Sequence, residues 1–232
     1  MAGSDLSVLR ISSLSDLVFG LALSIGAIAL IGHTPQDAGE LLNGIIGFAG
    51  SFIILINLWM NYSTISAYQR VESHGEAWLN VWMLMGVALE PFLFNLLIQG
   101  SSTAGFNDLA SQVYAIDLGL VLACQAGMNE LTFQKGIHGD RVGSQLHLGA
   151  LGLGLSATIF FISAAPPFGL MLSFGGLSFR LRYLLWFIVF VNRPFLRRFR
   201  RQRTLSEGSP VLTGRGPRHA EAPAPTGLPP AP

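Results

Sequence analysis

The sequence predicts an all-α membrane protein with six transmembrane helices. Half of its 232 residues are hydrophobic and only 12% are charged, whereas soluble domains carry about a quarter charged residues. Several apolar runs approach the roughly 20 residues that an α-helix needs to cross a bilayer. No loop between these runs is long enough to hold a soluble domain. Any function must therefore reside in the helices and their short connections.

The predicted spans are apolar segments separated by short polar loops. They cover approximately residues 13–31, 41–60, 77–98, 111–131, 146–164 and 179–199. The first ends before Gly32 and a polar loop. The fifth ends before Pro166 and Pro167, because proline cannot continue a helix without loss of backbone hydrogen bonds.

The sixth span has two alternative positions. Residues 168–191 are long enough to cross, but Arg180 and Arg182 would then lie near the middle of the helix. We prefer a short apolar connector over residues 168–177, followed by a helix that begins near residue 179. This arrangement places both arginines near one interface, where long side chains can extend their charges to water.

The distribution of basic residues predicts that both termini are cytoplasmic. Arg70 lies in the second loop, Lys135 and Arg141 lie in the fourth, and six arginines lie within residues 193–203. Loops with excess Lys and Arg stay in the cytoplasm, and the basic cluster also attracts anionic lipid. Residues 1–203 form the predicted membrane domain. Residues 204–232 hold seven of the twelve prolines and are predicted to be a disordered tail.

The first span carries two different faces. Small and polar residues recur at helical spacing on one face: Ser13, Asp16, Gly20 and Ser24. Apolar residues form the adjacent face: Leu21, Ile25 and Ile28. Small residues allow membrane helices to approach closely and apolar residues face lipid, so helix packing is one interpretation of this arrangement. The functional alternative makes one face a pore lining and the other its support.

The same helix contains a motif that resembles a known family. The pattern R-x-x-x-F-S-D-x-V-F-A-x-A is matched here, with Leu14 and Gly20 as departures, by Arg10, Ser15, Asp16, Val18, Phe19 and Ala22. Two later segments, FIILINLWMNYSTISAY and WLNVWMLMGVALEPF, have similar counterparts. Over approximately residues 10–92 the chain resembles the prokaryotic members of the transmembrane protein 175 family of potassium and cation channels.

This resemblance implies a potassium-permeable cation channel that assembles as a homotetramer around a central pore in the plasma membrane. The chain has no TVGYG-like segment, so a carbonyl-lined filter of that type is not available. In the family the first helix of each subunit lines the pore, and apolar residues form the constriction. The corresponding positions here are Leu21, Ile25 and Ile28. The implied partners are potassium ions, membrane lipids and further copies of the chain.

The polar residues at the start of the first helix then have a structural role. We expect Arg10, Ser15 and Asp16 to form a buried network that anchors this helix to its neighbours. Trp59 and Asn80, from the next two spans, are the expected partners. A buried Arg–carboxylate pair with additional hydrogen bonds holds helices together strongly.

Two acidic residues inside later spans support an alternative function. Glu90 and Asp117 lie at membrane depth, where ionisable residues commonly mark ion or proton pathways. They fit a small proton-coupled secondary transporter, although each could instead be a neutral, hydrogen-bonded group. The five histidines show no metal-site spacing. We expect no metal, no cofactor, no enzymatic activity and no nucleic-acid binding.

Overall fold

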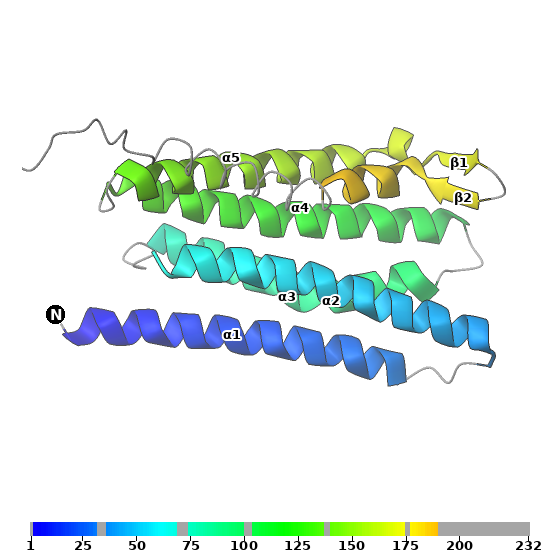
Figure 1. Cartoon of the computed structure of the whole chain (residues 1–232), viewed down its shortest axis with the longest axis horizontal. Helices are drawn as coiled ribbons and strands as arrows, with labels where there is room; N and C mark the ends of the chain where they lie inside the picture. Colours follow the sequence, from blue (N-terminus) through cyan, green and yellow to red (C-terminus); the bar gives the residue numbers. More distant parts are fainter. Residues whose placement is uncertain are drawn as a thin grey trace, which may run out of the picture. The chain divides into compact units, whose positions relative to one another are not determined.

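The computed structural model describes residues 2–31, 36–68, 74–99, 104–136, 140–174 and 177–189. Five long helices account for most of them (Figure 1): α1 (Ala2–Ile31), α2 (Ala38–Ser66), α3 (His74–Gln99), α4 (Ala104–Gln134) and α5 (Asp140–Ser163). Each coincides with one of the first five predicted helical segments, and most extend beyond it. The prediction of these five helices is confirmed.

Four of these helices are long and apolar enough to cross a membrane. The crossing segments are Ala38–Ser66, His74–Ile98, Gly105–Gln134 and Val142–Ser163. The apolar part of α1, Ser13–Ile28, is shorter. A further helix begins at residue 181 and is described to residue 189, close to the predicted start of the sixth span. The remainder of this helix, the basic cluster and the proline-rich tail lie outside the described residues.

A short β-hairpin connects α5 to the helix at residue 181. After one 3-10 turn, Pro166–Gly169, strand β1 (Met171–Phe174) pairs antiparallel with β2 (Leu177–Arg180). The sequence predicts only an apolar connector here, without regular structure. Within the described residues the fold is therefore all-α except for this hairpin. Its strands satisfy each other's backbone groups, which an irregular apolar segment could not do away from water.

The two arginines beside the hairpin lie inside the protein. Arg180 is 8% exposed and Arg182 is fully buried. Arg180 Nη1 lies 2.8 Å from Oδ1 of Asp108, near the start of α4. Arg182 donates from Nε to the carbonyl of Ser163, the last residue of α5, at 2.7 Å, and from Nη1 to the hydroxyl of Ser111. The prediction that these side chains extend to water was wrong, because α4 and α5 supply their partners.

Helices α3, α4 and α5 approach one another closely at two glycines. A Cβ atom on Gly86 of α3 would lie 2.5 Å from Val121 of α4, and one on Gly119 of α4 would lie 2.9 Å from the ring of Phe161 of α5. Small residues at such crossings bring backbones together, and close van der Waals packing stabilises helix association in lipid.

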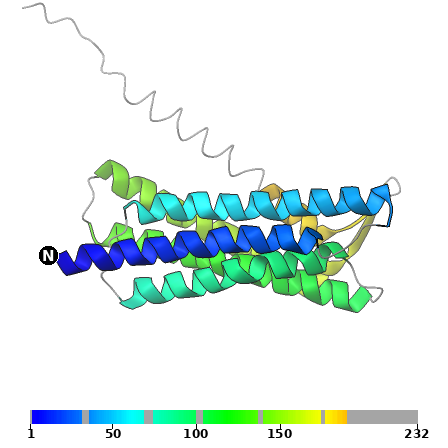
Figure 2. The ribbon, with the colours of Figure 1, turned by 90° about the horizontal axis from the view of Figure 1, so that it is seen from below.

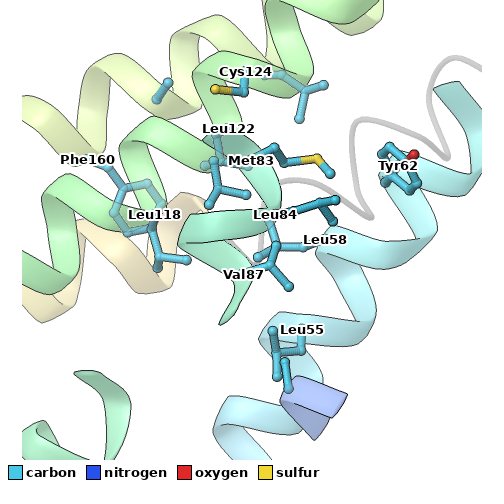
Figure 3. Packing of buried hydrophobic residues seen from close by; sticks show 14 of the residues in the cluster. Leu55, Leu58, Tyr62, Met83, Leu84, Val87, Leu118, Leu122, Cys124 and Phe160 are labelled. Atoms are coloured by element: carbon cyan, nitrogen blue, oxygen red, sulfur yellow. The ribbon is translucent and has the colours of Figure 1, made fainter. Parts of the chain in front are cut away.

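Helix α1 lies at the edge of the bundle and runs along α2 and α3 (Figure 2). The buried core lies mainly between α2, α3, α4 and α5, and it also includes Phe19 and Ala22 of α1. Figure 3 shows Met83 of α3 beside Leu122 of α4, with Phe160 of α5 next to Leu118. One side of α1 is thus held by its neighbours, and the other side faces away from them.

Candidate pore-lining helix and its anchor

The side of α1 that faces away from the core carries the three predicted constriction residues. Leu21 is 57% exposed, Ile25 is 38% exposed and Ile28 is 64% exposed. Leu14 and Leu17 extend this apolar surface toward the start of the helix and are also exposed. No described part of the same chain covers these side chains. They are available to lipid, to a pore or to another copy of the chain.

The small and polar stripe of α1 is exposed as well. The four residues of this stripe are all exposed: Ser13, Asp16, Gly20 and Ser24. A Cβ atom on Gly20 would meet nothing within 4 Å, and the Ser24 hydroxyl donates to the carbonyl of Gly20. Packing among the described residues of the subunit therefore does not explain this stripe. A close approach of a second helix here would have to come from outside the described residues.

The opposite side of α1 is buried against α2 and α3. Phe19 and Ala22 are almost completely buried, and the ring of Phe19 contacts that of Tyr62 with centroids 5.8 Å apart. Phe19 and Ala22 belong to the sequence motif of the first helix. The motif thus contains side chains that fix the helix to its own subunit, while the exposed residues lie between them in sequence.

Ser15 is the centre of a buried polar contact among three helices. The Tyr62 hydroxyl of α2 donates to Ser15 Oγ at 2.7 Å, and Asn80 Nδ2 of α3 donates to the same oxygen at 3.3 Å. All three residues are buried. A hydroxyl that receives two hydrogen bonds inside an apolar environment fixes the relative positions of the three helices, because either bond is costly to lose there.

Asp16 occupies the rim of this contact. Its carboxylate accepts a hydrogen bond from the indole nitrogen of Trp59 at 3.1 Å, and both side chains are exposed. The structure thus brings Ser15, Asp16, Trp59 and Asn80 together, but it leaves Asp16 at the surface of the chain. The expected partner Arg10 belongs to α1, and its side chain lies outside the described residues.

Tyr62 is the member of this group that the sequence did not identify. One signal was available, because Tyr62 follows Trp59 by three residues and so lies on the same face of α2. A hydroxyl on that face is a natural partner for the Ser-Asp pair of α1.

The two membrane-depth carboxylates lie elsewhere, between α2, α3 and α4. Glu90 is fully buried and accepts hydrogen bonds from the hydroxyls of Ser51, at 3.0 Å, and Tyr114, at 3.2 Å. Asp117 is 7% exposed and lies one helical turn after Tyr114. The structure therefore brings these two acids together inside the subunit, apart from the exposed face of α1.

Among the described residues, no group of three or more His, Cys, Asp or Glu side chains could hold a metal ion. The geometry instead offers an exposed apolar helix face and a polar anchor beneath it. Such a face is suited to contact with lipid or with protein in the membrane.

The segment that carries the exposed face of α1 is similar to a known family. Residues 10–91 match the sequence model of a family described as "Endosomal/lysosomal potassium channel TMEM175". The matched segment begins at the motif in α1 and ends within α3, so it contains both the exposed face and its anchor. No curated protein gave a significant match.

A solved structure extends the likeness beyond this segment. The chain resembles a variant of the potassium channel MtTMEM175, crystallised in complex with a Nanobody-MBP fusion protein, with a TM-score of 0.54 and 17% sequence identity. The alignment covers 84% of this chain and 93% of that one. It shows a shared fold over most of both chains. The match over residues 10–91 shows a likeness to the TMEM175 family of potassium channels across the first three helices, and the solved structure shows a similar fold beyond them.

Proposed function

We propose that the chain is one subunit of a homotetrameric, potassium-permeable cation channel in the plasma membrane. In this proposal α1 of each subunit lines a central pore, and four copies of Leu21, Ile25 and Ile28 form its constriction. The observation that carries the proposal is the exposed face of α1 opposite its anchored side. One helix cannot enclose a pore, so several copies must contribute.

The composition of the exposed face supports a pore as well as a subunit contact. The apolar residues form one stripe, and the small residues, with Gly20 open to close approach, form the neighbouring stripe. Helices around an axis need both: side chains that point toward the axis and small positions where adjacent helices meet. Leu21 and Ile28 are well placed for the first role and Gly20 for the second.

An apolar constriction acts on ions by its effect on water. A narrow ring of Leu and Ile side chains removes water from a cation without offering replacement oxygen ligands, so small changes in its radius open or close the path. Potassium as the permeant ion is supported by the matched family and by the similar solved structure, both of which are described as potassium channels. Cytoplasmic placement of both termini is supported by the basic residues of the sequence.

The first test is the bi-ionic reversal potential of the purified protein in a planar bilayer, with potassium on one side and sodium on the other. We expect the reversal potential to shift clearly toward the potassium equilibrium. Reversal near zero would contradict potassium selectivity and indicate a weakly selective pore. Saturable, pH-driven uptake without channel current would favour the transporter alternative instead.

Cysteine accessibility tests the pore lining separately. In a Cys124→Ser background, which removes the one native cysteine, Leu21→Cys should react with a water-soluble thiol reagent and lose current. The matched control is Leu155→Cys on α5, because Leu155 is 65% exposed in the subunit and equally apolar. Leu155→Cys should conduct normally after the same treatment. Equal behaviour of the two variants would show that α1 does not line the pore.

A further inference from the structure

Glu90 and Asp117 form an acidic pair in the interior of the subunit. Glu90 lies on α3 directly before Pro91, and the Asp117 carboxyl group of α4 lies beside Gly86, one turn before Glu90 on α3. Their buried position separates them from the exposed face of α1. The chemistry of this pair therefore does not depend on which helix lines the pore.

The hydrogen bonds of the pair are unequal. Each carboxylate oxygen of Glu90 accepts from a hydroxyl, one from Ser51 of α2 and one from Tyr114 of α4. Oδ2 of Asp117 is buried and has no hydrogen-bond partner among the described residues. Its other oxygen lies where a side chain on Gly86 would contact it, 3.0 Å from an ideal Cβ position. Gly86 thus leaves the space that the Asp117 carboxyl group occupies.

The described residues packed around the pair supply no positive charge. Helix α2 contributes Ser51, and α4 contributes Tyr114. The helix that starts at residue 181 contributes Trp186, whose ring contacts Tyr114. Arg180 and Arg182 bind Asp108 and Ser111. Both of these partners lie about one turn or more before Tyr114 on α4.

The basic group at the opposite end of α4 is also engaged elsewhere. Lys135 forms an ion pair with Glu76, with 2.8 Å between its Nζ and Oε1 of the glutamate. Tyr114 therefore remains the titratable neighbour of the two acids within the described part of the chain.

Two ionised carboxylates in this position would be very unfavourable. Like charges that share a site disfavour one another's ionisation, and a buried charge without a partner is strongly destabilising. We propose that Glu90 and Asp117 form a proton-binding site in each subunit, which holds one proton at neutral pH. The proton resides on Asp117, because hydroxyl donors already stabilise both oxygens of Glu90. This proton allows α3 and α4 to pack closely at Gly86.

Infrared difference spectroscopy of the purified full-length protein in lipid nanodiscs tests this site, because protonated carboxyl groups absorb apart from carboxylates. Wild-type protein at neutral pH should show a protonated-carboxyl band that exchanges slowly in heavy water. Asp117→Asn should lose this band. The matched control Asp37→Asn changes an exposed acid at the start of α2 and should retain the band undiminished.

A second variant keeps the test decisive where Asp117→Asn fails to assemble. Glu90→Gln should retain the band at a changed frequency, because the group beside the proton is then an amide. A wild-type spectrum without the band overturns the proposal, as does a band that survives in Asp117→Asn. A band of unaltered frequency in Glu90→Gln also overturns it, since the proton would then lie elsewhere.

Discussion

The hydroxyl of Tyr62 donates a hydrogen bond to Oγ of Ser15 across 2.7 Å, and so joins α2 to α1 in the interior of the subunit. Asn80 of α3 donates to the same oxygen. We therefore propose that Tyr62 and Asn80 position the pore-lining face of α1 by holding the opposite, buried side of this helix.

Tyr62→Phe tests this anchor. The change removes one donor and preserves the ring contact with Phe19, so we expect destabilisation of about 0.5–1.5 kcal/mol, the net worth of one hydrogen bond. The measurement is the thermal unfolding midpoint of the purified protein. Tyr68→Phe, at an exposed position just beyond the end of α2, is the control and should unfold like the wild type. An equal decrease of the unfolding midpoint in both variants would show that the contact with Ser15 has no special role in stability.

Asp16→Asn tests whether the motif acid acts on assembly or on ion selection. Asp16 lies at the subunit surface beside Trp59, not on the stripe of Leu21 and Ile28. We therefore expect less assembled protein or smaller current, with an unchanged reversal potential. Trp59→Phe removes the donor of the 3.1 Å hydrogen bond to Asp16. It should likewise reduce assembly or current without changing the reversal potential. Normal assembly combined with altered selectivity in Asp16→Asn would contradict this role.

Asp108→Asn tests the arginine cluster between α4, α5 and the hairpin. It leaves two buried guanidinium groups without their carboxylate, and loss of one partner from a buried ion pair costs roughly 3–5 kcal/mol. We expect early cleavage near residues 170–180 during limited proteolysis, since β2 and the following helix lose their attachment. Asp37→Asn, on the exposed N-terminal end of α2, should leave the cleavage rate unchanged. Wild-type resistance in Asp108→Asn would show that the cluster does not hold this segment.

Gly119→Ala tests the close approach of α4 to α5. The added methyl group would lie 2.9 Å from the ring of Phe161, and such overpacking typically costs about 1–3 kcal/mol. We expect a lower unfolding midpoint, restored in part by Phe161→Leu in the same chain. Gly154→Ala on α5 is the control, because nothing lies within 4 Å of its added carbon. If both glycine variants unfold alike, crowding at Phe161 is not the cause.

Much of the helical fold was predictable, because a bilayer imposes a length and an apolar composition that a single segment either has or lacks. The predicted segments 41–60 and 77–98 lie inside α2 and α3 for this reason. The hairpin after α5 was not predictable by this argument, since its apolar residues suit a strand, a span or a connector equally well. Arg182 was misplaced because its partners are 19 and 71 residues away in the sequence.

The candidate site also contains residues that the sequence predicted and one that only the structure identified. Leu21, Ile25 and Ile28 were named from the motif, and the structure places all three on an exposed face of α1, while their function as a constriction stays a prediction. Tyr62 was missed because its value lies in a contact with Ser15, 47 residues earlier. Helical spacing could place it on the correct face of α2, but could not say which helix that face meets.

The sequence by itself determined that this chain is a helical membrane protein whose first helix carries a motif that resembles that of the TMEM175 family. Those properties depend on the local order of apolar, small and polar residues. Only the tertiary structure decided which polar side chains meet inside the bundle: Ser15 with Tyr62 and Asn80, Arg182 with Ser163, and Glu90 with Ser51 and Tyr114. A buried polar group must find a partner, but the sequence does not say which one, because that choice depends on how the helices cross.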